Sequence, residues 1–94
     1  MIAFDAGPKL SLGEIHVTLG AAAKIPTEDI AECVRRHGRG DWGEIDVADR
    51  ELNDQRLRNG GPIASIYTAS NGLKFYVLTE ADRSLTTVLL PEEY

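Results

Sequence analysis

The sequence predicts an α+β fold in which two helices pack on an antiparallel sheet of about four strands, in the order β-α-α-β-β-β. Three observations predict this fold. Apolar and polar residues alternate near the N-terminus, apolar residues then recur at helical spacing, and the C-terminal third consists of apolar runs joined by short polar turns. A chain of 94 residues is expected to form one domain, 1–94, with residues 1–9 as an irregular N-terminal arm.

Residues 10–19 have the period of a half-buried strand. One side of this strand is expected to be apolar and the other polar, with Gly13 marking a bulge or a shift of phase. The apolar side is formed by Leu10, Leu12, Ile15, Val17 and Leu19, and the polar side by Glu14, His16 and Thr18.

The first helix is expected to begin at Thr27, whose hydroxyl can accept a hydrogen bond from a free amide of the first turn. Glu28 and Asp29 suit the positive end of the helix dipole. Gly38 is expected to end the helix in a left-handed conformation. One face of the helix is formed by residues three and four apart, namely Ile30, Cys33, Val34 and His37.

The second helix is expected to run from about Val47 to Arg58, opened by Asp46 and stopped by residues 59–62. Its apolar face is thin, so a helix lying on the surface and held by few contacts is predicted.

The C-terminal strands are predicted to form two hairpins. Asn71 and Gly72 favour a two-residue turn, which sets Ile66 opposite Val77 and Tyr67 opposite Tyr76. A second turn centred on Asp82 and Arg83 sets Val77 opposite Val88, Thr79 opposite Thr86 and Tyr76 opposite Leu89. Both faces of the resulting sheet are apolar, and one of them carries Tyr67, Tyr76, Leu78 and Leu89. Because an antiparallel sheet usually exposes one polar face, this second face is a candidate interface, including that of a homodimer.

Composition limits the function. The net charge of −5 argues against direct binding of nucleic acid and is suited to a protein partner with a basic surface. No apolar run is long enough for a membrane helix, and no secretion signal is recognised. The single cysteine, Cys33, excludes a disulfide framework and favours the cytoplasm. His16, His37 and Cys33 do not have the spacing of a zinc site, so no metal and no cofactor is expected.

Three polar segments are candidate binding sites. Asp41 and Trp42 lie between the helices, where Trp42 is either an aromatic anchor for a partner or a plug in the core. Asp82 and Arg83 belong to the densest polar cluster, which is either a site or a hydrogen-bonded turn. The acidic C-terminal segment could contact a basic partner or remain solvated, and it contains Glu92, Glu93 and Tyr94.

Two strings, RHGRGDWGEIDVADRELND (36–54) and TEADRSLTTVLLPEEY (79–94), resemble a family of small uncharacterised bacterial proteins labelled "plasmid-related". The resemblance covers residues 10–94 and is most specific at 40–43, 79–87 and 90–94. It implies a gene carried by plasmids and other mobile elements, and it identifies no catalytic residues. We therefore expect a small acidic, non-enzymatic interaction protein of a mobile element. Inhibition of a host defence complex, such as CRISPR or restriction, is the expected role.

An enzyme is the alternative. The predicted order of elements is similar to that of mRNA-cleaving toxins of the RelE kind, although those proteins are strongly basic. A ribonuclease would require several candidate side chains to meet in one cleft, and these are Arg36, His37, Asp82, Arg83 and Tyr94. A homodimeric scaffold is the second alternative.

Overall fold

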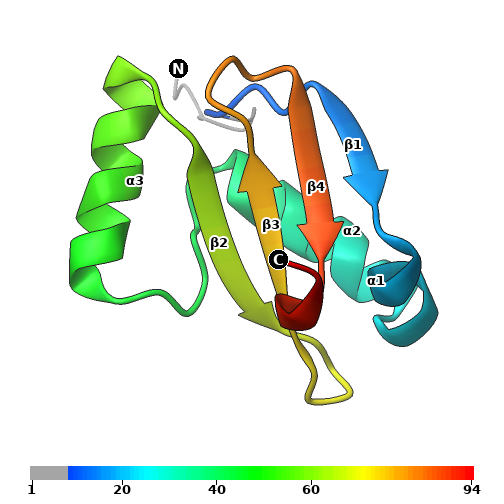
Figure 1. Ribbon diagram of the computed structural model, residues 1–94. Coiled ribbons are helices and arrows are strands. Elements are labelled where there is room, and N and C mark those ends of the chain that lie inside the picture. The colour runs from blue at the N-terminus through cyan, green and yellow to red at the C-terminus, as the bar shows by residue number, and fades with distance from the viewer. Residues whose placement is uncertain (1–8) are drawn as a thin grey trace, which may run out of the picture.

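The computed structural model of the protein describes residues 9–94. A four-stranded sheet and its helices form the α+β fold predicted from the sequence (Figure 1). The elements are β1 (Glu14–Val17), α1 (Leu19–Lys24), α2 (Thr27–Gly38), α3 (Val47–Asn59), β2 (Ile63–Thr68), β3 (Lys74–Thr79), β4 (Leu85–Leu89) and a short 3-10 helix η1 (Pro91–Glu93). One helix, α1, was not predicted. The arm predicted for residues 1–9 lies outside the described residues, except for Lys9.

The sheet is mixed and has the order β1-β4-β3-β2. The pairs β2–β3 and β3–β4 are antiparallel, whereas β1 runs parallel to β4. The prediction of antiparallel pairing is therefore wrong for β1. Three helices separate β1 from β2 and return the chain to the far edge of the sheet, so that β1 enters beside β4 in the same direction (Figure 1).

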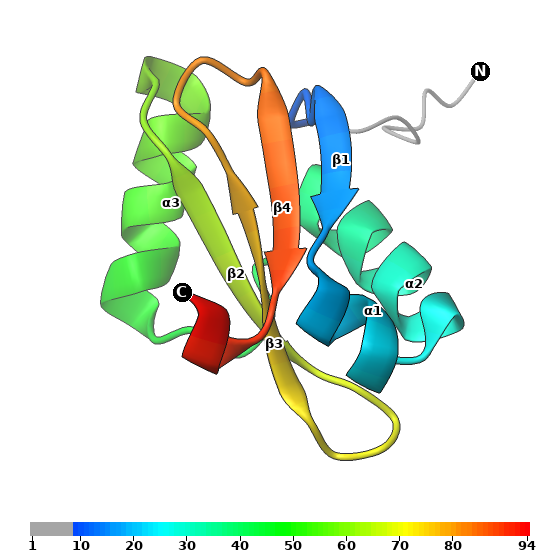
Figure 2. The same ribbon diagram turned by 45° about the vertical axis from the view of Figure 1, so that its right-hand side comes forward.

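The helices cover the two faces of the sheet unequally. Helix α2 lies behind it, α1 lies past the lower end of β1, α3 lies beside β2, and η1 lies in front near the lower end of β4 (Figures 1 and 2). The main core is therefore on the back face. There the predicted apolar face of α2 packs toward three sheet residues that are fully buried, Phe75, Val77 and Val88.

The ends of the helices differ in part from the prediction. Thr27 is the first residue of α2 rather than its cap, and Pro26 occupies the cap position without a side-chain hydrogen bond. Gly38 is the last residue of α2, and the positive φ of 84° belongs to Gly40. At α3 the predicted cap is confirmed, since the carboxylate of Asp46 accepts a hydrogen bond of 2.8 Å from the backbone amide of Asp49.

The predicted register of the first hairpin is wrong by one residue. The loop contains three residues, 70–72, because the amide of Ala69 donates to the carbonyl of Leu73 and the left-handed position (φ 86°) is taken by Gly72. Tyr67 therefore lies opposite Phe75, and Ile66 lies opposite Tyr76. A shift of one residue exchanges the faces of the strand, so Tyr67 enters the back core and Ile66 comes to the front. The predicted register of β3 with β4 is confirmed.

Strand β1 is not half-buried as predicted. All four of its residues are exposed, and the exposed fractions of Ile15 and Val17 are 48% and 39%. Leu19, at the start of α1, is 90% exposed. Strand β1 is the last strand of the sheet on its side, and Ile15 and Val17 pair with Thr86 and Val88, which are fully buried. Apolar and polar residues do alternate in β1, but the strand has a neighbouring strand on one side only, namely β4, and its side chains stay exposed.

Candidate functional site

The front face of the sheet contains an apolar groove. It is lined by Ala64, Ser65, Ile66, Tyr76, Leu78, Pro91 and Tyr94, and it has a volume of about 440 Å³. A smaller hollow of about 190 Å³ lies on the side of α3 and shares Ala64 and Ile66 with the groove. The two hollows therefore adjoin at β2, and the smaller one is also lined by polar and charged side chains of α3, namely Asp49, Asn53 and Arg56.

The aromatic wall of this groove is formed by Tyr76 and Tyr94. Their rings meet edge to face with centroids 5.7 Å apart, and Tyr94 is 78% exposed. Such a pair offers a large apolar surface together with two hydroxyl groups, which is typical of protein-binding surfaces. Of the four residues predicted to share an interface, Tyr76 and Leu78 line the groove, Leu89 is buried, and Tyr67 lies on the opposite face.

The carboxylate of Glu93 holds η1 in place beneath the groove. Its Oε1 accepts hydrogen bonds from the hydroxyl of Thr18 (2.6 Å) and from the amide of Leu90 (2.8 Å), and its Oε2 accepts one from the amide of Gly20 (3.3 Å). The hydrogen bond from Thr18 is the main reason why the pKa of Glu93 is lowered. Glu93 thus connects η1 to α1 and has a structural role, whereas the side chain of Glu92 is 65% exposed and lies 3.9 Å from the ammonium group of Lys24.

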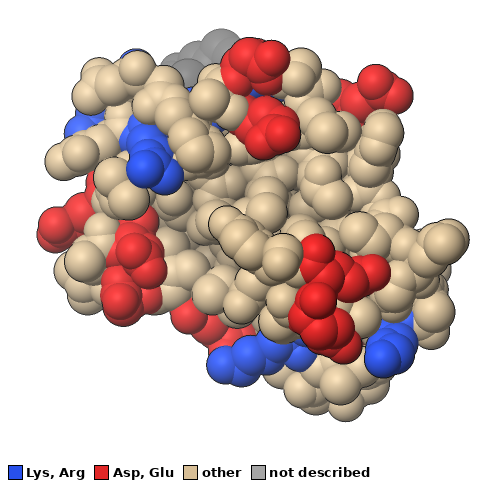
Figure 3. Space-filling model, viewed as in Figure 1, with Lys and Arg blue, Asp and Glu red and all other residues tan. Residues whose placement is uncertain are grey.

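Acidic side chains surround the apolar centre of this face. Figure 3 shows Asp and Glu over α3, over the upper end of the sheet and over η1, with uncharged surface between them. Basic side chains on the same face are fewer, and they lie over the upper end of α3 and along the lower edge of the view. The face therefore combines an apolar centre with an acidic rim.

Trp42 lies in the core, in agreement with the second of its two interpretations. It is 2% exposed and packs with Leu10 and Ile63, and its indole N–H donates to the carboxylate of Asp54 at 2.9 Å. In this position the ring cannot serve as an exposed anchor.

Asp41 orders the loop that contains Trp42. Its carboxylate accepts hydrogen bonds from the guanidinium of Arg36 (2.7 Å) and from the amide of Gly43 (3.1 Å), and its carbonyl accepts one from the hydroxyl of Tyr67 (2.5 Å). The hydrogen bond with Arg36 is the largest cause of the lowered pKa of Asp41. Gly43 follows with φ 74°, and a Cβ there would lie 2.0 Å from the carbonyl oxygen of Ile66. These contacts explain the Gly-Asp-Trp-Gly block as a loop fastened to β2.

Asp82 and Arg83 form a structural turn between β3 and β4. Asp82 accepts hydrogen bonds from the hydroxyl (2.6 Å) and the amide of Ser84, which lower its pKa. Arg83 has φ 63°, and its guanidinium donates to the carbonyl oxygens of Arg56 (2.7 Å) and Gly61 (2.6 Å). Arg83 therefore binds carbonyl groups at the C-terminal end of α3, where a positive charge is favourable.

His37 is the centre of a buried polar chain. The hydroxyl of Thr86 donates to the carbonyl of Leu12 (2.7 Å), so it must accept from Thr79 (2.7 Å). Thr79 in turn accepts from Nε2 of His37 (2.9 Å), which leaves Nδ1 to accept from the hydroxyl of Ser65 (2.6 Å). The carbonyl at one end thus fixes the neutral Nε2–H tautomer. Burial, with the charge of Arg83 as a smaller cause, lowers the pKa of His37 to about 4.

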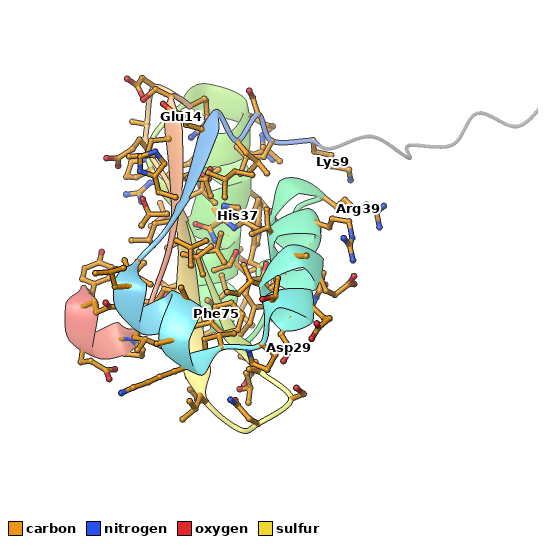
Figure 4. All side chains as sticks on the ribbon, turned by 90° about the vertical axis from the view of Figure 1, so that its right-hand side faces the viewer. Lys9, Glu14, Asp29, His37, Arg39 and Phe75 are labelled. Carbon is orange, nitrogen blue, oxygen red and sulfur yellow. The ribbon has the colours of Figure 1, made fainter. Side chains whose placement is uncertain are left out.

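The five side chains considered for catalysis do not meet. His37 is fully buried between the sheet and α2, as Figure 4 shows, and Arg36 is paired with Asp41 near the end of the same helix. Asp82 and Arg83 are used in the β3–β4 turn, and Tyr94 lies on the front face. Within residues 9–94, no group of three or more His, Cys, Asp or Glu residues is arranged to hold a metal ion.

None of the helices in residues 9–94 is long and apolar enough to cross a membrane. Comparison of the chain with protein-family models, curated proteins and solved structures gives no match.

Two features of the groove were missed by reasoning from the sequence. The predicted two-residue loop sets Ile66 opposite Val77, on the face that is buried, whereas the three-residue loop sets it opposite Tyr76 on the front face. Asn53 was overlooked because a polar residue within a polar helix is normally solvated. It is 4% exposed, and its side-chain amide donates to the carbonyl of Ala64 at 2.8 Å, which fixes α3 beside the groove.

Proposed function

We propose that the protein is a small acidic, non-enzymatic protein-binding domain encoded by a mobile element, and that the front groove is its binding surface. The observation that carries this proposal is the open apolar groove over β2 and β3 beside η1, which is lined by Ile66, Tyr76, Leu78 and Tyr94 among others. Concave apolar surfaces with exposed tyrosines are typical of interfaces.

Charge indicates the kind of partner. Carboxylates outnumber basic groups on the face that contains the groove, and the chain has 15 acidic against 10 basic residues. A partner with an apolar projection flanked by Lys and Arg would be complementary in both shape and charge. The resemblance to mobile-element proteins makes a host defence complex, CRISPR or restriction, the first partner class to test.

Photo-crosslinking from the groove tests the proposal. A photoreactive phenylalanine derivative is placed at Tyr94 in the protein expressed in a plasmid-bearing bacterium, and the same probe at Leu73 is the control. Leu73 is 41% exposed but lies beside the β2–β3 turn, outside the groove. We expect a discrete adduct with one protein from position 94 only. The adduct should disappear when Leu78→Glu places a charge in the groove, and purified partner should bind wild type more weakly as salt increases.

The outcome that contradicts the proposal is equally specific. If position 94 gives no adduct, or if positions 73 and 94 give the same adducts with and without Leu78→Glu, the groove is not the binding surface. The anti-defence role is tested separately, by the efficiency of transformation of a targeted plasmid into a host with active CRISPR or restriction. Wild type should raise this efficiency and Leu78→Glu should not.

A further inference from the structure

Among residues 9–94, no segment pairs with the outer edge of β1, which is an open strand edge in this part of the chain. The amides of Glu14 and Thr18 donate to the carbonyls of Ser84 and Val88. In a parallel pair, alternate residues bond to the neighbouring strand, so Glu14, His16 and Thr18 face β4. The N–H and C=O groups of Ile15 and Val17 therefore point away from the sheet. Figure 4 views the molecule from this side, and β1 lies in front of the rest of the sheet.

At the opposite edge of the sheet, the outward peptide groups of β2 are hydrogen-bonded by a loop and by a side chain. On the outer side of β2, the amide of Ile66 donates to the carbonyl of Trp42 (3.3 Å) and its carbonyl accepts from the amide of Glu44 (2.7 Å). The side chain of Asn53 is hydrogen-bonded to both the N–H and the C=O of Ala64. Within residues 9–94 no comparable loop or side chain is hydrogen-bonded along β1.

The backbone of β1 is anchored at both ends despite its exposure. Before it, Gly13 has φ 64°, and a Cβ there would lie 2.4 Å from the backbone of Ser84. After it, the hydroxyl of Thr18 caps α1 by accepting from the amide of Ala21 at 3.1 Å. The edge is therefore preformed, and pairing would not require the strand to become ordered.

The sequence of β1 is complementary to itself in one antiparallel register. If Ile15 is paired with Val17 of a second copy, all four outward peptide groups of each strand are used, giving four hydrogen bonds about a twofold axis. Ile15 and Val17 then form apolar cross-strand pairs on the back face. On the other face His16 lies opposite His16 of the partner subunit, and each histidine keeps its own Glu14, which is 3.4 Å away in the monomer.

We propose that β1 is the homodimerisation edge of this protein, through antiparallel pairing of β1 with β1 of a second copy into a continuous eight-stranded sheet. The proposal is independent of the front groove, which lies on the opposite side of β4. A strand of four residues buries little surface. Since stable dimers bury roughly 1,200 Å² or more, the association is weak and depends on concentration.

Sedimentation equilibrium of the purified protein from about 10 µM to about 1 mM tests the proposal. We expect the average mass to rise from 10.3 kDa toward twice that value. Ile15→Pro removes an outward N–H without touching the bonds to β4, and it should weaken the dimer at least about tenfold. The matched control, Ile15→Val, keeps the N–H and the branched side chain and should still dimerise.

A second variant avoids any effect of proline on folding. His16→Glu places like charges opposite each other at the twofold axis and should also weaken the dimer at least about tenfold, whereas the neutral His16→Gln should not. A protein that remains monomeric at about 1 mM overturns the proposal. So does a dimer that Ile15→Pro and His16→Glu leave unchanged, or one that Leu78→Glu in the front groove abolishes.

Discussion

The two edges of the sheet differ in how their outward peptide groups are satisfied. At β2, the Gly-Asp-Trp-Gly loop and the amide of Asn53 hydrogen-bond the outward groups of Ile66 and Ala64. At β1, the outward groups of Ile15 and Val17 meet no such loop in the described part of the chain. The difference shows that the polar and glycine residues of one loop close the β2 edge, whereas no segment within residues 9–94 closes the β1 edge.

The closed edge should be most sensitive at Gly43. A methyl group in Gly43→Ala would lie 2.0 Å from the carbonyl oxygen of Ile66, and the backbone would have to keep φ 74°. We expect a loss of at least about 3 kcal/mol in the free energy of unfolding. Urea denaturation measures this loss. The control is Gly72→Ala, which has φ 86° but no atom within 4 Å of the added Cβ, and should cost only about 1 kcal/mol.

The interior behind the closed edge should respond to pH through His37. Its pKa in the folded protein, about 4, is below the ordinary value of 6.5, so the unfolded chain binds the proton first as the pH falls. The free energy of unfolding is therefore expected to decrease from pH 6.5 to about pH 4, by about 3 kcal/mol in total.

Urea denaturation of wild type and His37→Gln across this pH range isolates the effect of the histidine. Carboxylates with lowered pKa, such as Asp41 and Glu93, also stabilise the folded state less as the pH falls, but they do so equally in both proteins. The difference in the free energy of unfolding between wild type and His37→Gln should therefore decrease as the pH falls, by the amount that protonation of His37 costs the folded wild type. A difference that does not change with pH would contradict the buried neutral imidazole.

Asn53 should matter more than its place in a polar helix suggests. Asn53→Ala leaves the carbonyl of Ala64 without its side-chain partner, and we expect a loss of about 2 kcal/mol in the free energy of unfolding. Gln55→Ala on the exposed side of α3 is the control and should change it by less than about 0.5 kcal/mol. Equal effects of the two substitutions would show that Asn53 does not fasten α3 to β2.

Proline compares the two edges directly, and at β1 it gives the smallest expected effect on stability. Ile15→Pro removes an N–H that the monomer does not use, so its cost at dilute concentration should be below about 1 kcal/mol. Ile66→Pro removes the hydrogen bond to the carbonyl of Trp42 and should cost about 3 kcal/mol. Thermal unfolding of both variants checks this comparison. Similar losses would mean that the β1 edge is also bonded in the monomer.

Patterns of neighbouring residues correctly predicted those parts of the fold that depend on interactions between residues close in the sequence. The buried face of α2, the cap of α3 by Asp46 and the register of β3 with β4 all follow from spacing along the chain. The parallel pairing of β1 with β4 was not accessible in this way, because it joins segments about seventy residues apart. The loop at Ser70–Gly72 contains one residue more than the Asn-Gly signal implies, and this single residue moved Ile66 to the front face.

The candidate site was predicted only in part for the same reason. Tyr76, Leu78 and Tyr94 were singled out by their apolar pattern and terminal position, and all three line the groove. Trp42, Asp41 and Arg83 were singled out by residue type, and the structure uses each of them internally. Residue type alone does not distinguish a binding loop from a loop that closes a sheet edge.

Amide hydrogen exchange, followed residue by residue by NMR, tests the difference between the edges most directly. At about 20 µM, the amides of Ala64 and Ile66 should be protected while those of Ile15 and Val17 exchange at nearly the rate of an unstructured chain. At about 1 mM, Ile15 and Val17 should gain protection as the dimer forms, and Ala64 and Ile66 should not change. Protection of Ile15 and Val17 that is already present at 20 µM and independent of concentration would contradict the open edge.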